Sequence, residues 1–264
     1  MTYILSAART PMGGFQGDLA GLTAPQLGSA AIRAALARAG LGGEDASEVL
    51  MGNVLPAGLG QAPARQASLG AGVPDSVPCT TISKVCGSGM KAIMLGADAI
   101  AAGHAAIVVA GGMESMTNAP YLLPKARGGL RMGHGETKDH MFLDGLEDAY
   151  EGRLMGTYGD EAARAYQFSR DDQDAYAMES LARAKRAVSD GSFASEIVPV
   201  TVKTRAGESE IAVDEQPGKA DPKKIPNLKP AFAKDGTVTA ATSASISDGA
   251  AALAIAGEAA VKAA

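Results

Sequence analysis

Short apolar runs alternate with alanine-rich amphipathic runs through the first hundred residues, and this alternation most constrains the fold of the chain. The strand-like runs begin at Tyr3, Glu48, Thr80 and Ala105. Helix-like runs lie between them, at residues 24–40 and 90–103. Such alternation is typical of layered α/β folds. We therefore expect strands and helices that are arranged in α/β layers.

Helix-start and helix-stop signals delimit the first of these helices. Thr23 is a favourable N-cap residue, and Pro25 lies in the first turn, where its missing N–H costs no hydrogen bond. Gly40 marks the expected end. The apolar stripe between them consists of leucine and small alanine side chains, which suits close packing between the layers of a fold.

The composition changes at about Thr117 and changes back at about Thr242. Between these points glycine, proline, methionine and charged residues increase, and strand-like runs become few. We interpret residues 117–242 as a segment inserted into a core that is formed by residues 1–116 and 243–264.

One helix and one strand are predicted inside this inserted segment. The helix begins after Ser169, a favourable N-cap residue, and ends at Gly191. The strand-like run covers residues 196–202. The alternating pattern resumes after Gly236, and a last helix is expected to begin at Glu258.

Composition excludes several classes of protein. The 264 residues include only two cysteines, too few for a disulfide framework, so we expect a reducing compartment and a cytoplasmic protein. No apolar run approaches the roughly 18 residues of a membrane helix, and the first residues do not form a signal peptide. A net charge of −5 does not predict a nucleic-acid partner. Lysines within residues 203–234 either contact an anionic ligand or form a solvated face.

The stretch from Thr80 to Gly96 is the strongest candidate for chemistry. A β-branched run is followed by Cys86, by the Gly-Ser-Gly tripeptide that contains Ser88, and by a helix. A thiol at a helix N-terminus lies near unpaired N–H groups and the positive end of the helix dipole, which favour the nucleophilic thiolate. The flanking glycines are expected to permit a tight turn and to let a substrate approach the backbone. The alternative is a buried, inert cysteine.

Other potential partners of Cys86 are too far away. Cys79 lies seven residues earlier, which on a single strand predicts a separation of roughly 23 Å, so we assign it to the core. His104 follows the predicted helix and is expected to lie roughly 25 Å from the thiol. His134 and His140 belong to the inserted segment. No set of these residues has the spacing of metal ligands, so we expect no metal site.

Six ordered motifs make the chain similar to the N-terminal part of thiolases, specifically to acetyl-CoA acetyltransferases. The motifs are SAARTPMGGFQGDLA (6–20), GNVLPAGLGQAPARQA (52–67), ISKVCGSGMKAIMLG (82–96), VAGGMESMTNAPYLLP (109–124), SRDDQDAYAMES (169–180) and LKPAFAKDGTVTAATSASISDGAA (228–251). The resemblance implies the N-terminal half of a thiolase-like layered α/β/α core with an inserted loop domain that binds coenzyme A.

The resemblance also implies roles for individual residues. Cys86 resembles the nucleophile that accepts an acyl group from acyl-CoA as a thioester. Coenzyme A is substrate and product, so no further cofactor is implied. Leu146, Met155, Phe232 and Ala244 correspond to positions that contact its pantetheine arm. For Leu146 and Phe232, packing inside the inserted segment remains an alternative.

Three positions depart from the family pattern. Leu154 stands where many biosynthetic thiolases carry histidine, and Ala244 stands where they carry serine, so two polar contacts to pantetheine are replaced by apolar groups. Near the Asp214-Glu215 pair the family has an arginine, for which Lys219 is a potential substitute without the planar fork of a guanidinium.

The function that this resemblance implies is condensation of two acetyl-CoA molecules to acetoacetyl-CoA and CoA, or the reverse cleavage. The alternatives are a 3-ketoacyl-CoA thiolase of fatty-acid β-oxidation and a non-catalytic remnant that binds acyl-CoA. The Gly-His-Pro histidine and second cysteine of the family's C-terminal half do not occur before Ala264. We therefore expect a chain that lacks this half and has little activity alone. The resemblance further implies a homodimer or homotetramer, without nucleic-acid or membrane partners.

Overall fold

The computed structural model describes residues 1–204 and 207–263, and the chain forms two compact units. The first, which we call the core unit, consists of Met1–Asn118, Ala194–Glu215 and Ser247–Ala264. The second, which we call the inserted unit, consists of Ala119–Phe193 and Gln216–Ile246. We expected the inserted segment at residues 117–242, whereas residues 194–215 belong to the core unit.

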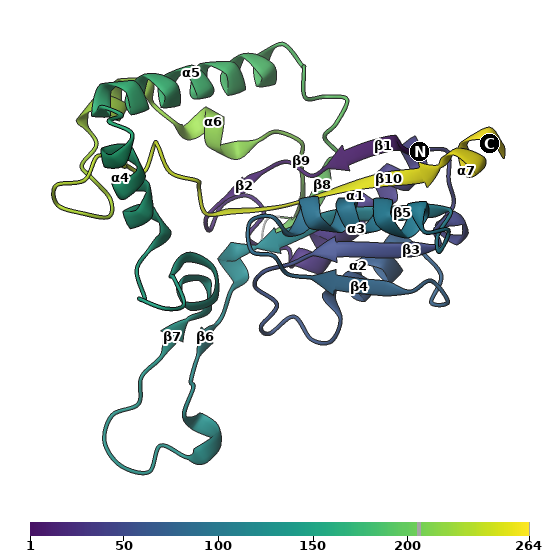
Figure 1. Ribbon diagram of the computed structural model, residues 1–264, viewed down its shortest axis with the longest axis horizontal. Coiled ribbons are helices and arrows are strands. Elements are labelled where there is room, and N and C mark those ends of the chain that lie inside the picture. The colour runs from purple at the N-terminus through teal and green to yellow at the C-terminus, as the bar shows by residue number, and fades with distance from the viewer. Residues whose placement is uncertain (205–206, 264) are drawn as a thin grey trace. The chain divides into compact units, whose positions relative to one another are not determined.

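A mixed sheet forms the centre of the core unit (Figure 1). Its strand order is β1 (Thr2–Arg9), β10 (Ser247–Gly257), β5 (Ile107–Ser115), β3 (Glu48–Gly52) and β4 (Cys79–Ile82), with the short β2 (Gly13–Gly14) paired to β10. β3 is parallel to β4 and β5, whereas β10 is antiparallel to β1 and β5. The first and last strands of the chain are therefore neighbours in the sheet.

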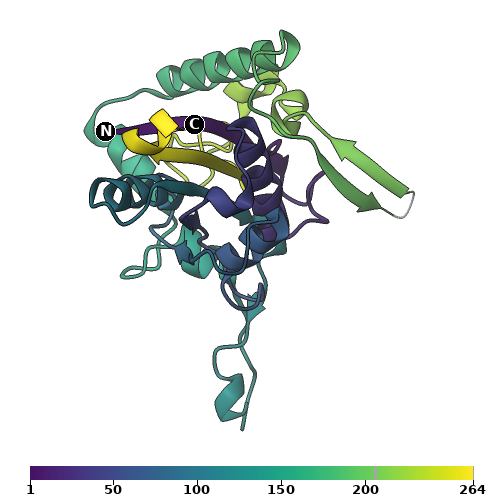
Figure 2. The same cartoon turned by 90° about the vertical axis from the view of Figure 1, so that its right-hand side faces the viewer.

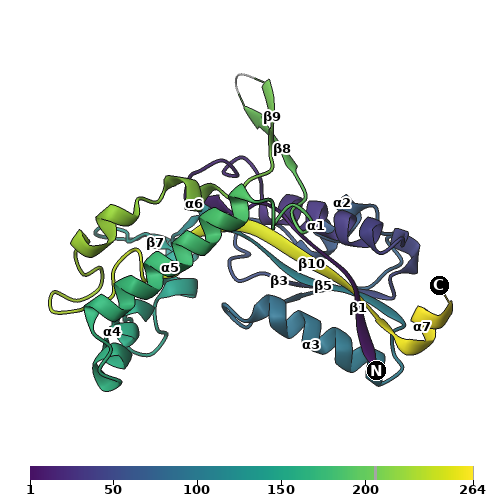
Figure 3. The same cartoon turned by 90° about the horizontal axis from the view of Figure 1, so that it is seen from above.

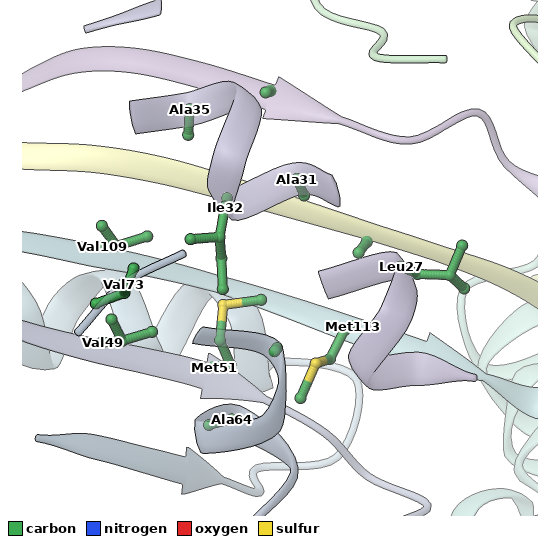
Figure 4. Packing of buried hydrophobic residues seen from close by; sticks show 14 of the residues in the cluster. Leu27, Ala31, Ile32, Ala35, Val49, Met51, Ala64, Val73, Val109 and Met113 are labelled. Atoms are coloured by element: carbon green, nitrogen blue, oxygen red, sulfur yellow. The ribbon is translucent and has the colours of Figure 1, made fainter. Parts of the chain in front are cut away.

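Helices cover both faces of this sheet, as predicted. α1 (Ala24–Arg38) and α2 (Pro63–Ala71) lie on one face, and α3 (Ser88–Ala101) lies on the other (Figure 3). Neighbouring residues of β5 point to opposite faces. Val109 packs in the cluster that α1 shares with β3, whereas Val108 packs in the cluster beneath α3. In Figure 4, Ile32 of α1 points toward Met51 of β3.

The helix signals in the sequence are confirmed for α1. Thr23 is the N-cap residue, and its hydroxyl accepts a hydrogen bond from the Gln26 N–H at 3.4 Å. The Gln26 side chain accepts the Thr23 N–H at 2.8 Å in return. This reciprocal capping box satisfies two N–H groups that a helix start otherwise leaves unpaired. The helix ends one residue before the Ala39 C-cap, and Gly40 follows with φ of +70°.

The hairpin of β8 (Val200–Thr204) and β9 (Gly207–Ile211) corrects the predicted domain boundaries (Figure 2). We placed this segment in the inserted part because its sequence is rich in charge, but the buried Val200 and Val202 pack in the main core cluster. The strand also begins at Val200, four residues later than predicted. Alternation of valine with polar residues produces one buried face, which composition averaged over a long segment conceals.

Helices are the longest regular elements of the inserted unit. Its regular elements are β6 (Tyr121–Leu122), β7 (Lys138–Asp139), α4 (Met155–Ala165), α5 (Arg170–Ser189) and most of α6 (Glu215–Lys219). Ser169 caps α5 as predicted, with its hydroxyl accepting the Asp172 N–H at 3.1 Å, and Gly191 follows the helix with φ of +77°.

The last part of the chain returns to the core unit. The segment after Gly236 does not resume strand structure at once, because β10 begins only at Ser247. The helix expected from Glu258 is present as α7 (Glu258–Ala263). Among the described residues, no helix has the length and apolar character needed to cross a bilayer.

Candidate active site

Cys86 lies exposed in the turn that joins β4 to α3. β4 ends at Ile82, and α3 begins at Ser88 after the N-cap residue Gly87, which has no side chain to bond the helix start. The N–H groups of the first helical turn and the positive end of the helix dipole therefore lie next to the thiol. The predicted position of Cys86 at a helix start is confirmed, and the buried alternative is wrong.

Val85 is the residue that adopts the left-handed backbone conformation in this turn. The Gly87 N–H donates to the Lys84 carbonyl oxygen at 3.1 Å, and Val85 has φ of +47°. A β-branched residue rarely adopts this left-handed conformation, because its Cβ crowds the backbone. We expected glycines to provide the turn, but Gly87 has φ of −89° and Gly89 lies within α3. The strained residue therefore precedes the thiol directly.

Two glycines of the sheet, Gly52 and Gly112, let the start of α3 pack closely against it. A Cβ atom on Gly52 would lie 2.6 Å from the Ser88 Cβ and 2.8 Å from the Gly89 nitrogen. A Cβ atom on Gly112 would lie 3.3 Å from the Gly89 Cα. Gly52 and Gly112 are partners on the neighbouring strands β3 and β5. Their missing side chains permit this close approach, which fixes the height of the Cys86 turn above the sheet.

Cys79 packs against the core cluster, as predicted. Its thiol donates to the Val77 carbonyl oxygen at 3.3 Å. The two cysteines do not share one strand, however, since β4 ends three residues after Cys79. His104 lies beyond the far end of α3, and the 14 residues of this helix correspond to about 20 Å at 1.5 Å per residue. His104 is therefore remote from the Cys86 turn.

A cluster of charged groups, which sequence reasoning missed, joins residues 194–215 to the sheet. The Arg9 guanidinium donates to both carboxylate oxygens of Asp214, at 2.7 and 2.9 Å, and to Glu196 at 2.7 Å. Glu215 accepts the N–H groups of Gly14 and Asp18 at 2.8 and 3.0 Å. The Asp214-Glu215 pair of the sequence motif thus anchors a segment within the core unit.

This cluster shifts the proton affinity of its members. Burial alone would raise the pKa of Asp214, but hydrogen bonds from the Arg9 side chain and the Met12 N–H, together with the Arg9 charge, outweigh burial and lower it. For Arg9, burial would lower the pKa, but the two carboxylates outweigh it and raise the pKa. Both groups are therefore held in their charged forms.

Three of the four predicted pantetheine residues come together within the inserted unit. Glu147 forms a β-bridge with Leu154. Leu146 precedes the first of these residues and Met155 follows the second, so the two lie close to this bridge. A Cβ atom on Gly156 would lie 2.2 Å from the ring of Phe232, so this ring packs directly against the first turn of α4. Leu146 and Phe232, which are half-buried, and the exposed Met155 therefore lie near the start of α4. Ala244 is exposed.

The inserted unit also holds the two remaining histidines, and one of them is paired. His140 is buried, and its Nδ1 lies 2.6 Å from an Asp144 carboxylate oxygen. Within residues 1–204 and 207–263, no group of three or more histidine, cysteine, aspartate or glutamate side chains is arranged to hold a metal ion.

Comparison with known proteins identifies the family. The model of the thiolase N-terminal domain matches residues 2–259. The chain belongs to the thiolase family. This thiolase chain is 48% identical over 262 residues to an acetyl-CoA acetyltransferase of Schizosaccharomyces pombe, covering 98% of our chain and 66% of the relative. It is 52% identical to acetyl-CoA acetyltransferase 1 of Arabidopsis thaliana, covering 95% of our chain and 61% of that relative.

A solved structure agrees with the fold. The crystal structure of a thiolase from Ascaris suum in complex with coenzyme A superimposes with a TM-score of 0.93 at 43% identity, and the match covers 99% of our thiolase chain and 67% of that chain. The predicted thiolase-like layered α/β fold is therefore confirmed. Our chain spans about two thirds of the length of these relatives.

Proposed function

We propose that this chain supplies the nucleophile of an acetyl-CoA C-acetyltransferase. The observation that carries the proposal is the exposed Cys86 thiol at the uncapped start of α3. Thiolate is the reactive form of cysteine, and a helix N-terminus favours it. The identity of 48 to 52% to acetyl-CoA acetyltransferases supports the short-chain substrate, and the coenzyme A in the related Ascaris suum structure supports the acyl carrier.

In the proposed first step, the Cys86 thiolate attacks the carbonyl carbon of acetyl-CoA. The bond between this carbon and the CoA sulfur breaks, CoA leaves as a thiolate that takes up a proton, and an acetyl thioester remains on Cys86. In the second step, another acetyl-CoA loses a proton from its methyl group. The resulting carbanion attacks the acetyl carbonyl carbon, Cys86 leaves as thiolate, and acetoacetyl-CoA forms.

Within this proposal the remaining groups have separate roles. The resemblance to thiolases assigns activation of the nucleophile to a histidine, and movement of the substrate proton to a second cysteine, both from the family's C-terminal half. Leu146, Met155, Phe232 and Ala244 are proposed to contact the pantetheine arm of coenzyme A, which is both substrate and product. The grouping of the first three around the start of α4 supports this assignment. We further propose that the protein forms a homodimer or homotetramer in the cytoplasm.

The proposed nucleophile is tested by intact-mass analysis after incubation with acetyl-CoA. We expect one acetyl adduct on the wild-type chain and none on Cys86→Ala. Cys79→Ala is the matched control, because it removes the other thiol and should keep the adduct. An adduct that persists in Cys86→Ala would contradict the proposal. Continuing release of CoA that depends on Cys86 would exclude the non-catalytic remnant, and a preference for longer acyl groups would favour the β-oxidation enzyme.

A further inference from the structure

One buried hydroxyl group holds the turn on which Cys86 lies. The Ser88 side chain is only 4% exposed. Its Oγ donates to the Val85 carbonyl oxygen at 2.7 Å and accepts the Lys84 N–H at 2.8 Å. The hydroxyl thus connects both residues that precede Cys86 to the first residue of α3.

One of the two hydrogen bonds of the Ser88 hydroxyl goes to Val85, the strained residue of the turn. Val85 has φ of +47°, a conformation that a valine leaves readily unless neighbouring groups hold it. A change of this φ would rotate the next residue, Cys86, relative to the helix start. The position of Ser88 is itself fixed, because its Cβ lies against the backbone of Gly52.

We infer that Ser88 is a positioning residue for the Cys86 nucleophile: its hydroxyl keeps Val85 in the left-handed conformation and thereby keeps the thiol at the open start of α3. The inference deepens the proposed function and rests on Cys86 being the nucleophile. The helix start does not depend on this hydroxyl alone, since the Ser88 N–H also donates to the Val85 carbonyl oxygen at 3.1 Å. We therefore expect Ser88→Ala to fold.

The first test compares Ser88→Ala with Ser29→Ala. Ser29 is a matched control in the same unit, because its hydroxyl contacts the carbonyl oxygens of Pro25 and Ala67 at 2.8 and 3.0 Å, far along the chain from the Cys86 turn. The readout is the rate of alkylation of Cys86 by iodoacetamide as a function of pH, with the modified cysteine located by peptide mass.

Ser88→Ala should slow alkylation of Cys86 about tenfold across the pH profile, as expected when one hydrogen bond that holds the turn is lost. Ser29→Ala should stay within about twofold of wild type, because its effect is limited to stability. An unchanged profile in Ser88→Ala would overturn the inference, as would an equal change in both variants.

A double-mutant cycle tests whether Ser88 affects the reactivity of Cys86 through Val85. Glycine adopts a positive φ without strain, so Val85→Gly should make the hydroxyl less necessary. We expect the alkylation penalty of Ser88→Ala to shrink from about tenfold to about twofold in the Val85→Gly background. This background also permits the measurement if Ser88→Ala alone does not fold by circular dichroism. Equal penalties in both backgrounds would show that Ser88 does not act through Val85.

Failure of the inference is distinguishable from failure of the proposed function. If wild-type Cys86 is alkylated but takes no acetyl group from acetyl-CoA, the proposed function fails while the comparison of alkylation rates still decides the role of Ser88. If the wild-type chain and Ser88→Ala are acetylated and alkylated at equal rates, the proposed function stands and the positioning role is wrong.

Discussion

Two segments of the core unit are anchored to the same sheet by contrasting groups. Residues 194–215 are held by charges, with Arg9 between the carboxylates of Asp214 and Glu196. The turn at residues 84–88 is held by neutral groups: a serine hydroxyl, backbone hydrogen bonds and contacts between glycine backbones. A carboxylate in the second anchor would oppose a thiolate at the helix start. Neutral anchoring therefore fixes the turn without cancelling the helix dipole.

The starts of three helices show the same contrast. α1 and α5 begin with capping boxes, in which Thr23 and Ser169 bond the first-turn N–H groups. The N-cap residue of α3 is Gly87, which has no side chain to do so. Capping by a side chain stabilises a helix but occupies its positive end. Of these three starts, the uncapped one lies next to Cys86.

The largest effect is expected from breaking the charged anchor. Asp214→Asn preserves shape but leaves the partly buried Arg9 with weaker partners, so we expect the free energy of unfolding to fall by about 3 kcal/mol. Urea unfolding measures this change. Glu208→Gln is the matched control in the same segment, because its pair with Lys203 is exposed and should contribute under about 1 kcal/mol. Equal losses in both variants would contradict an anchoring role for Asp214.

Acidification tests the same anchor without changing its shape. The pKa of Asp214 is lowered in the folded chain, so its stabilising contribution is complete above the unfolded pKa of about 3.9 and is lost as pH falls through the lowered folded value. The stability difference between the wild-type chain and Asp214→Asn should therefore be constant near neutral pH and narrow below about pH 4. A difference that stays constant in acid would show that the carboxylate charge does not matter.

Adding charge to the neutral anchor should reduce the reactivity of Cys86. A Cβ atom on Gly87 would meet only the Lys84 carbonyl oxygen, at 3.5 Å, so a side chain fits there. Gly87→Asp should slow alkylation of Cys86 about tenfold, because a carboxylate disfavours a second negative charge beside it. Gly87→Asn has nearly the same shape without the charge and should retain most of the rate. Equal slowing in both variants would exclude charge as the cause.

The smallest effect is expected from relieving the strain in the turn. Val85→Gly removes a β-branched residue from a left-handed conformation, so we expect the free energy of unfolding to rise by about 0.5 to 1 kcal/mol, after the entropy cost of glycine. Val213→Gly is the control: this valine is similarly exposed and has no positive φ, so its replacement should destabilise the chain. Destabilisation by both substitutions would show that Val85 is not strained.

Local signals in the sequence predicted much of the fold. The α/β alternation, the caps at Thr23 and Ser169 and the helix start after Cys86 depend on residues within a few positions of one another. Such signals act over a single turn of helix or a single strand, and they can therefore be read along the chain. The six motifs along the chain likewise predicted a thiolase.

The sequence by itself determined several of the elements, the family and the thiol at a helix start. Only the tertiary structure decided that the β8–β9 hairpin joins the core, that Val85 takes the left-handed conformation, and that glycines of two strands support α3. Arg9 and Asp214 are 205 residues apart, and no local pattern links them. These features depend on contacts between distant segments, whose energies exist only after the chain has brought those segments together.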